Sequence, residues 1–157
     1  MREWEAAFRT TRKPGAPLDA VYIVAERAEE LVVVSQFRPA TGMHVIEFPA
    51  GLVDAGEDPA AAALRELREE TGHEGAVTRV GPATFSDPGC LEARQAFVSV
   101  DVDASKPPRP ALEDGEFIEV TTLPLNGLST ALESAAKARG ALVDGALHAY
   151  ALGLQRG

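Results

Sequence analysis

Residues 51–72 read GLVDAGEDPAAAALRELREETG, a loop that leads into a short helix rich in carboxylates. Asp58 is a favourable N-cap residue, Pro59 suits the first helical position, and Gly72 predicts the end of the helix. The apolar face of this helix, which we expect to pack against a sheet, consists of Ala60, Ala63, Leu64 and Leu67. The carboxylates are then expected on its exposed side.

The carboxylates of this helix indicate a metal site. Glu66, Glu69 and Glu70 share one helical face, where they repel one another, and they lie toward the C-terminal end, which is unfavourable for anions. Hard oxygen ligands of this kind select Mg²⁺ or Mn²⁺, and such ions commonly bridge carboxylates to substrate phosphates. Arg65 is expected to pair with Glu69 along the helix or to reach back to Glu57. The alternative is a solvated surface helix with salt bridges on its wet side.

The remaining pattern predicts one α/β domain over residues 1–157, with a mixed sheet between helices. The predicted strands are Val21–Val24 and Leu31–Phe37, joined as a hairpin, then Met43–Phe48, Ala96–Val102 and Phe117–Val120. The predicted later helices are Leu128–Arg139, which Gly140 ends, and Asp144–Leu154. The segment between the last two predicted strands, Asp103 to Gly115, is too rich in proline for regular structure and is predicted to form a long ordered loop.

Composition and charge exclude several classes of protein. The chain has 157 residues, is 45% hydrophobic and carries a formal net charge of −9, which argues against general nucleic-acid binding. Its single cysteine, Cys90, excludes an internal disulfide framework. We find neither an apolar run of membrane-spanning length nor the apolar core of a signal peptide. These features predict a soluble cytoplasmic protein.

The spacing within residues 51–72 resembles the signature of the Nudix hydrolases, G-x5-E-x7-R-E-U-x-E-E-x-G-U, where U is a bulky apolar residue. The positions that match are Gly51, Glu57, Arg65, Glu66, Leu67, Glu69, Glu70 and Gly72. His73 departs from the final apolar position, where an imidazole can still pack. The resemblance implies a Nudix-type α/β/α sandwich and hydrolysis of a pyrophosphate bond.

The flanking segments look like the ADP-ribose and ADP-sugar pyrophosphatase branch of that family. They are Trp4–Glu5, Arg9–Lys13, Gln36–Pro39, Ile46–Leu52, Ser86–Gly89 and Asp114–Val120. Pro88 sits where this branch typically has a proline. The similarity implies Mg²⁺-dependent hydrolysis (Mn²⁺ being the other candidate ion) of a small-molecule nucleotide sugar, ADP-ribose, to AMP and ribose 5-phosphate.

The same resemblance assigns roles to the metal-binding and orienting residues. Glu66 and Glu70 are implied as direct metal ligands, with Glu69 joining them directly or through water and the backbone carbonyl of Ala50 completing the site. Glu57 and Arg65 are implied to hold the metal-binding helix against its loop.

The remaining assignments concern the attacking water and the substrate. Glu116 matches the loop glutamate that activates or positions the attacking water. Trp4 matches a residue that stacks on adenine, and Arg9 and Arg38 match positions that contact the substrate, where guanidinium groups suit phosphate or ribose oxygens.

Several alternatives stay open at this point. Another nucleoside diphosphate derivative, either an oxidised nucleotide or a different nucleotide sugar, is the second candidate substrate. A non-catalytic module that binds a nucleotide sugar is a third hypothesis. Relatives usually carry an additional N-terminal segment that helps form a homodimer, whereas this chain begins three residues before Trp4, so a homodimer stays an open expectation. The number of metal ions and the preferred sugar are further open points.

Overall fold

The computed structural model describes residues 3–10, 18–109, 111–112 and 117–155. Its strands are β1 (Ala20–Arg27), β2 (Glu30–Arg38), β3 (Met43–Glu47), β4 (Ala50–Leu52), β5 (Gly75–Val80), β6 (Thr84–Phe85), β7 (Arg94–Val102), β8 (Ile118–Pro124) and β9 (Leu142–Val143). Its helices are α1 (Pro59–Glu66), a π-helical turn η1 (Leu67–Thr71) that continues α1, α2 (Leu128–Arg139) and α3 (Gly145–Leu154).

The described strands form one mixed sheet. Its main path runs β5-β7-β1-β2-β3-β9, while β4 pairs with β1, β6 with β7 and β8 with β2. The β1–β7 and β3–β9 pairs are parallel and the other pairs are antiparallel. The predicted mixed sheet is therefore confirmed.

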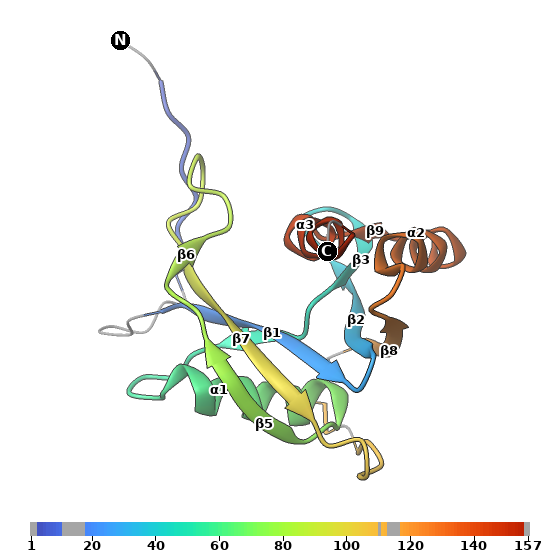
Figure 1. The fold of residues 1–157 in the computed structure, drawn as a ribbon. Helices are drawn as coiled ribbons and strands as arrows, with labels where there is room; N and C mark the ends of the chain where they lie inside the picture. The colour runs from blue at the N-terminus through green and yellow to red at the C-terminus, as the bar shows by residue number, and fades with distance from the viewer. Residues whose placement is uncertain (1–2, 11–17, 110, 113–116, 156–157) are drawn as a thin grey trace.

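Helices cover both faces of this sheet (Figure 1), with α1 on one face and α2 and α3 on the other. Alternation along β1 shows why, since side chains at successive positions of a strand point to opposite faces. Val21 and Ile23 join the core under α1, whereas Val24 joins the core under α2 and α3. The expected α/β/α sandwich is thus confirmed.

Local capping sets the helix boundaries. The Asp58 Oδ2 accepts from the Ala60 N–H at 2.9 Å, Pro59 begins α1, and Gly72 ends η1 at a φ of 71°, a left-handed conformation that favours glycine. The two later helices also lie where the sequence predicts them, with Gly140 ending α2 and Asp144 capping α3.

Three details of the sequence prediction were wrong. The β1–β2 hairpin turns more tightly than expected, because four of the six residues between the two predicted strands (residues 25–30) continue β1 and β2, and Arg27 pairs with Glu30. Leu64 is 36% exposed, and the buried stripe of the helix instead runs through Ala62, Ala63 and Leu67. Strand β8 begins after the 84%-exposed Phe117 and extends to Pro124, because its second half pairs with β2.

No described helix is long and apolar enough to cross a membrane. Between β7 and β8, residues 103–109 and 111–112 form turns and irregular backbone, as the proline content predicts. The rest of this loop lies outside the described residues.

Candidate active site

The end of the α1–η1 helix meets β2 and β4 at an acidic pocket of about 280 Å³. Its lining residues are Gln36, Arg38, Ala50, Gly51, Leu52, Arg65, Glu66, Glu69 and Glu70. All four predicted metal-binding residues are therefore in one place, together with Arg65 and Arg38. This convergence requires the tertiary fold, because Ala50 and Gly51 belong to a strand that pairs with β1.

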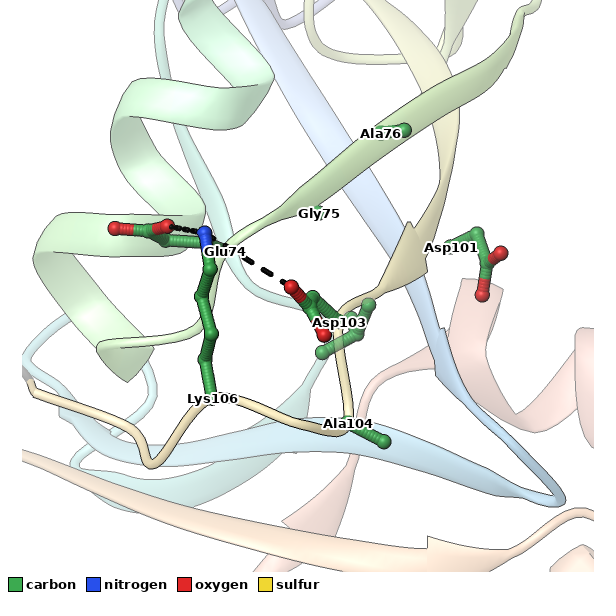
Figure 2. Close-up of a pocket in the computed structure, with 8 residues that line it drawn as sticks. Glu74, Gly75, Ala76, Asp101, Asp103, Ala104 and Lys106 are labelled. Atoms are coloured by element: carbon green, nitrogen blue, oxygen red, sulfur yellow. Dashed lines mark hydrogen bonds and ion pairs between the residues drawn. The ribbon is translucent and has the colours of Figure 1, made fainter.

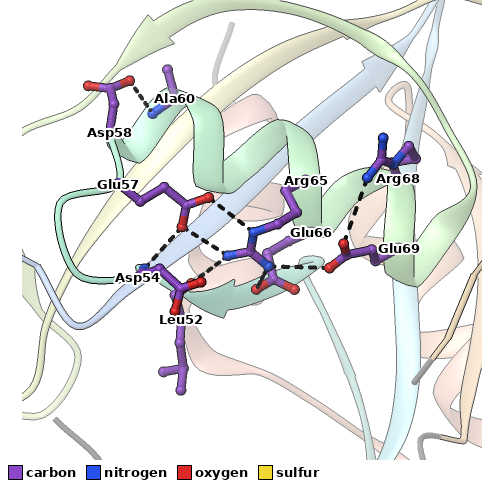
Figure 3. A network of polar contacts seen from close by, with 9 residues as sticks. All are labelled: Leu52, Asp54, Glu57, Asp58, Ala60, Arg65, Glu66, Arg68 and Glu69. Carbon is purple, nitrogen blue, oxygen red and sulfur yellow. Dashed lines mark hydrogen bonds and ion pairs between the residues drawn. The ribbon is translucent and has the colours of Figure 1, made fainter. Parts of the chain in front are cut away.

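Arg65 is the centre of a polar network in this pocket (Figure 3). Its Nε and Nη2 each donate to the Glu57 carboxylate at 3.0 Å, and Nη2 also donates to the Leu52 carbonyl at 3.0 Å. Its Nη1 donates to Glu66 at 2.7 Å and to Glu69 at 3.2 Å. Both pairings that the sequence offered for Arg65, with Glu69 and with Glu57, occur together, so one guanidinium fastens the loop to the helix.

The charges in this network reinforce one another. Hydrogen bonding to Arg65 lowers the pKa of Glu57, while the Glu57 and Glu66 carboxylates raise the pKa of Arg65 against the opposing effect of its burial. Glu57 also accepts from the Asp54 N–H at 3.0 Å. The network therefore stabilises the charged forms of both Glu57 and Arg65.

Glu70 lies deeper than the expected exposed helical face allows. Glu70 is only 5% exposed, and its Oε2 accepts a hydrogen bond from the Ala50 N–H at 3.1 Å. The buried stripe of the helix continues from Leu67 to Glu70 and Thr71 through the π-helical turn, a type of turn that is frequent at functional sites. The three carboxylates thus line a pocket together with Ala50 and Gly51, which favours a metal site over a solvated surface helix.

The donor chemistry of the pocket fits a divalent cation. Glu66, Glu69, Glu70 and the Ala50 backbone offer only oxygen atoms as ligands, as Mg²⁺ and Mn²⁺ prefer. Within the described ranges, no three acidic, histidine or cysteine side chains are already gathered in a metal-binding arrangement. The reason is visible in the hydrogen bonds, since Glu66 and Glu69 turn toward Arg65 and Glu70 turns toward the Ala50 N–H.

A buried carboxylate that the sequence analysis missed, Glu47, adjoins this pocket. Arg38 donates from Nε and Nη2 to the two Glu47 oxygens, both at 2.8 Å, in a bidentate pair. Burial lowers the pKa of Arg38, but the hydrogen bonds with Glu47 outweigh it and raise the pKa. Glu47 stands between the buried Ile46 and Phe48, and a carboxylate inside such an apolar run signals a cationic partner.

The structure treats the three predicted substrate residues differently. Arg38 lies in the pocket lining, whereas Trp4 and Arg9 belong to an exposed N-terminal segment that bonds to the loop before β7 through the Ala7 N–H and the Cys90 carbonyl at 2.8 Å. Trp4 is 72% exposed and is not among the lining residues. Burial, together with nearby acidic residues, raises the pKa of Tyr22, and the charges of Arg38 and Arg9 partly oppose this rise.

The remaining predicted site residues complete the comparison. Glu116 lies outside the described residues, so its role stays a prediction. His73 packs as the sequence analysis expected, because it is buried, and burial together with the charge of Arg27 lowers its pKa.

A mixed sheet between helices, with a pocket lined by carboxylates where a capped helix meets a glycine-containing strand, defines an α/β protein whose pocket offers oxygen ligands suited to a divalent cation. The NUDIX domain model matches residues 16–144, and the chain belongs to the Nudix family.

The chain is similar to known proteins over most of its length. An ADP-sugar pyrophosphatase of Mus musculus is 42% identical over 163 residues, which cover 98% of this chain and 74% of the mouse protein. An uncharacterized Nudix hydrolase of Schizosaccharomyces pombe is 42% identical over 165 residues, covering 100% of this chain and 80% of the relative. An ADP-ribose pyrophosphatase of Saccharomyces cerevisiae is 43% identical over 135 residues, covering 80% of this chain and 58% of the relative.

Proposed function

We propose that this Nudix hydrolase cleaves the pyrophosphate bond of ADP-ribose and related ADP-sugars, giving AMP and a sugar phosphate. The observation that carries the proposal is the pocket itself, in which Glu66, Glu69 and Glu70 lie together with Arg38 and strand β4. The names of the mouse and S. cerevisiae relatives support the choice of an ADP-sugar.

In this proposal Mg²⁺, with Mn²⁺ as a substitute, is held by Glu66, Glu70 and the Ala50 carbonyl, with Glu69 joining directly or through water. Bound there, such a cation would neutralise charge on the pyrophosphate and would make a nearby water more acidic. The ion also explains how a chain of net charge −9 binds a doubly anionic substrate, since local charge governs the site.

The other residues of the pocket act on geometry and on the substrate. Arg65 and Glu57 hold the helix against the loop, so that the carboxylates keep one orientation. Arg38, held by Glu47, offers its remaining N–H donors to phosphate or ribose oxygens. We keep Trp4, Arg9 and Glu116 as proposed contacts to adenine, substrate and attacking water.

A panel of substrates tests the proposal. Purified protein is incubated with ADP-ribose, ADP-glucose or 8-oxo-dGDP, with and without Mg²⁺, and the release of AMP or dGMP is measured. We expect AMP from ADP-ribose only when Mg²⁺ is present. Faster release of dGMP from 8-oxo-dGDP would move the assignment to oxidised nucleotides, and tight binding of ADP-ribose without turnover would indicate a non-catalytic module.

Gly51 provides a second prediction, because a Cβ added there would overlap the Cγ, Cδ and Oε1 atoms of Glu66. The Gly51→Ala substitution is expected to push the Glu66 carboxylate out of place and to lower the rate of ADP-ribose hydrolysis by about 10- to 100-fold. Since the end of a flexible side chain can move, the melting temperature should change little. Gly153→Ala is the matched control, since a Cβ there meets nothing within 4 Å. Equal rates for the two variants would contradict the prediction.

We also propose that the protein is located in the cytoplasm and forms a homodimer. Light scattering on the purified chain would measure its mass in solution, and a monomer at all concentrations would remove the homodimer from the proposal.

A further inference from the structure

The loop between β7 and β8 contains the sequence DASKPPRPA, residues 103–111, which we call the proline-rich segment. Proline has no backbone N–H, so within its PPRPA end only Arg109 and Ala111 can donate a backbone hydrogen bond. Both donate to carbonyl groups at the C-terminal end of the α1–η1 helix. The Arg109 N–H donates to the Gly72 carbonyl at 2.9 Å, and the Ala111 N–H donates to the Glu69 carbonyl at 3.0 Å.

The first half of the segment is fastened to the same place (Figure 2). Lys106 Nζ lies 2.5 Å from Glu74 Oε2 and 3.8 Å from Asp103 Oδ2, and the Asp103 N–H donates to the Glu74 carbonyl at 2.9 Å. The Asp103 side chain also accepts from both the N–H and the hydroxyl of Ser105, which closes a turn. The segment is therefore attached at both its beginning and its end.

The C-terminal end of the α1–η1 helix has carbonyl groups that need backbone donors from outside the helix. Carbonyl groups in the last turn of a helix have no partners within the helix, and they form the negative end of its dipole. Glu69 and Glu70 place two carboxylates in that same turn. The helix supplies part of the cap itself, since the Gly72 N–H donates to the Arg68 carbonyl and the Thr71 hydroxyl donates to the Leu67 carbonyl.

The proline-rich segment also brings positive charge to this end. Arg68, Lys106 and Arg109 line a shared pocket beside Gly72 and Glu74. Cations near a helix C-terminus are favourable. However, Lys106 and Glu74 are both well exposed, and exposed ion pairs contribute little. The two backbone donors are therefore the main candidates for fixing the turn.

We propose that the proline-rich segment is a rigid cap that positions the metal-binding carboxylates, with Arg109 and Ala111 as positioning residues. Their N–H groups hold the Glu69 and Gly72 carbonyls, so the turn that carries Glu69 and Glu70 keeps one orientation toward Ala50 and Gly51. Pro107 and Pro108 limit the number of conformations that the segment can adopt, which makes the cap rigid. This inference rests on the metal site of the proposed function, but not on the identity of the substrate.

Paired substitutions separate the N–H donors from the side chains. Arg109→Pro and Ala111→Pro remove the donors, whereas Arg109→Ala and Ala111→Ser keep them. The affinity for Mn²⁺ is measured by the electron paramagnetic resonance signal of the free ion, at a temperature where thermal melting shows each variant to be folded. We expect each proline variant to bind Mn²⁺ about tenfold more weakly than its donor-keeping partner, and saturating Mn²⁺ to restore most of kcat.

Hydrogen exchange on the unaltered protein keeps the proposal testable if a proline variant fails to fold. The amide protons of Arg109 and Ala111 should exchange well below their intrinsic rates, since each is bonded to a helix carbonyl. Exchange at the intrinsic rates would overturn the cap, as would proline variants that bind Mn²⁺ as tightly as their partners.

The outcomes also distinguish this inference from the proposed function. An unaltered chain that binds Mn²⁺ without hydrolysing ADP-ribose would remove the substrate assignment and leave the cap standing. An unaltered chain that binds no Mn²⁺ would overturn the cap together with the metal site.

Discussion

Replacement of Glu70 by glutamine is expected to lower the rate of ADP-ribose hydrolysis by about 10²- to 10³-fold while the protein stays folded. Glu70 is buried beside Ala50, whose N–H donates to Glu70 Oε2 at 3.1 Å. Glutamine has nearly the same shape, and its amide oxygen can accept the same hydrogen bond, but it lacks the charge that holds a divalent cation. The measurements are the steady-state rate at saturating Mg²⁺ and a thermal melt.

A second glutamate serves as the control for this substitution. Glu133 is exposed on α2, away from the pocket, so Glu133→Gln should leave the rate unchanged. Mg²⁺ should raise the melting temperature of the unaltered protein and of Glu133→Gln, but much less that of Glu70→Gln, because a ligand that binds the folded state stabilises it. A Glu70→Gln enzyme that keeps most of its rate would remove Glu70 from the metal site.

Replacement of Arg65 by alanine is expected to lower both stability and activity. The guanidinium donates to Glu57, Glu66, Glu69 and the Leu52 carbonyl, and its loss removes the cation that these three carboxylates share, leaving Glu69 only its longer ion pair with Arg68 at 3.8 Å. Because the side chain is 28% exposed, solvent screens these bonds, so we expect the free energy of unfolding to fall by only about 1–3 kcal/mol in the absence of metal. The rate should fall by about 10- to 100-fold, as for other residues that orient metal ligands.

Lysine at position 65 separates charge from geometry. Arg65→Lys keeps the positive charge but cannot reproduce the forked pattern of hydrogen bonds, so its stability and rate should lie between those of Arg65→Ala and the unaltered protein. Arg79→Ala, at an exposed position on β5, is the control for loss of a surface arginine. Chemical denaturation and steady-state kinetics measure both quantities. If Arg65→Ala matched Arg79→Ala in both, the network would have no role in holding the helix.

The helix of residues 59–71 shows how much local sequence can predict. Its boundaries follow from Asp58, Pro59 and Gly72, and each acts through contacts within a few residues. The Arg65 pairs with Glu57 and Glu69 also lie within reach along one loop and one helix. Such features could be predicted because they depend on spacing alone.

Burial in the same helix could not be predicted so well. The expected apolar face included Leu64, which is exposed, and placed the carboxylates in solvent, whereas Glu70 is buried. Which side of a helix is covered depends on how it crosses the sheet, and η1 departs from the α-helical period on which the prediction was based. The pair between Arg38 and Glu47 was missed for a related reason, since these side chains meet across two strands although Arg38 lies opposite Met43 and Glu47 opposite Val34 in the register.

The sequence by itself therefore determined the chemistry of this protein: a capped helix with a fixed order of carboxylates and one arginine, which marks it as a Nudix protein. Only the tertiary structure decided where that chemistry takes place. Strand β4 brings Ala50 and Gly51 against the helix through pairing with β1, and the proline-rich segment that follows β7 donates backbone hydrogen bonds to the Glu69 and Gly72 carbonyls at the end of the helix. These contacts join residues distant in the chain, and their formation depends on the packing of the whole sheet, which no local pattern encodes.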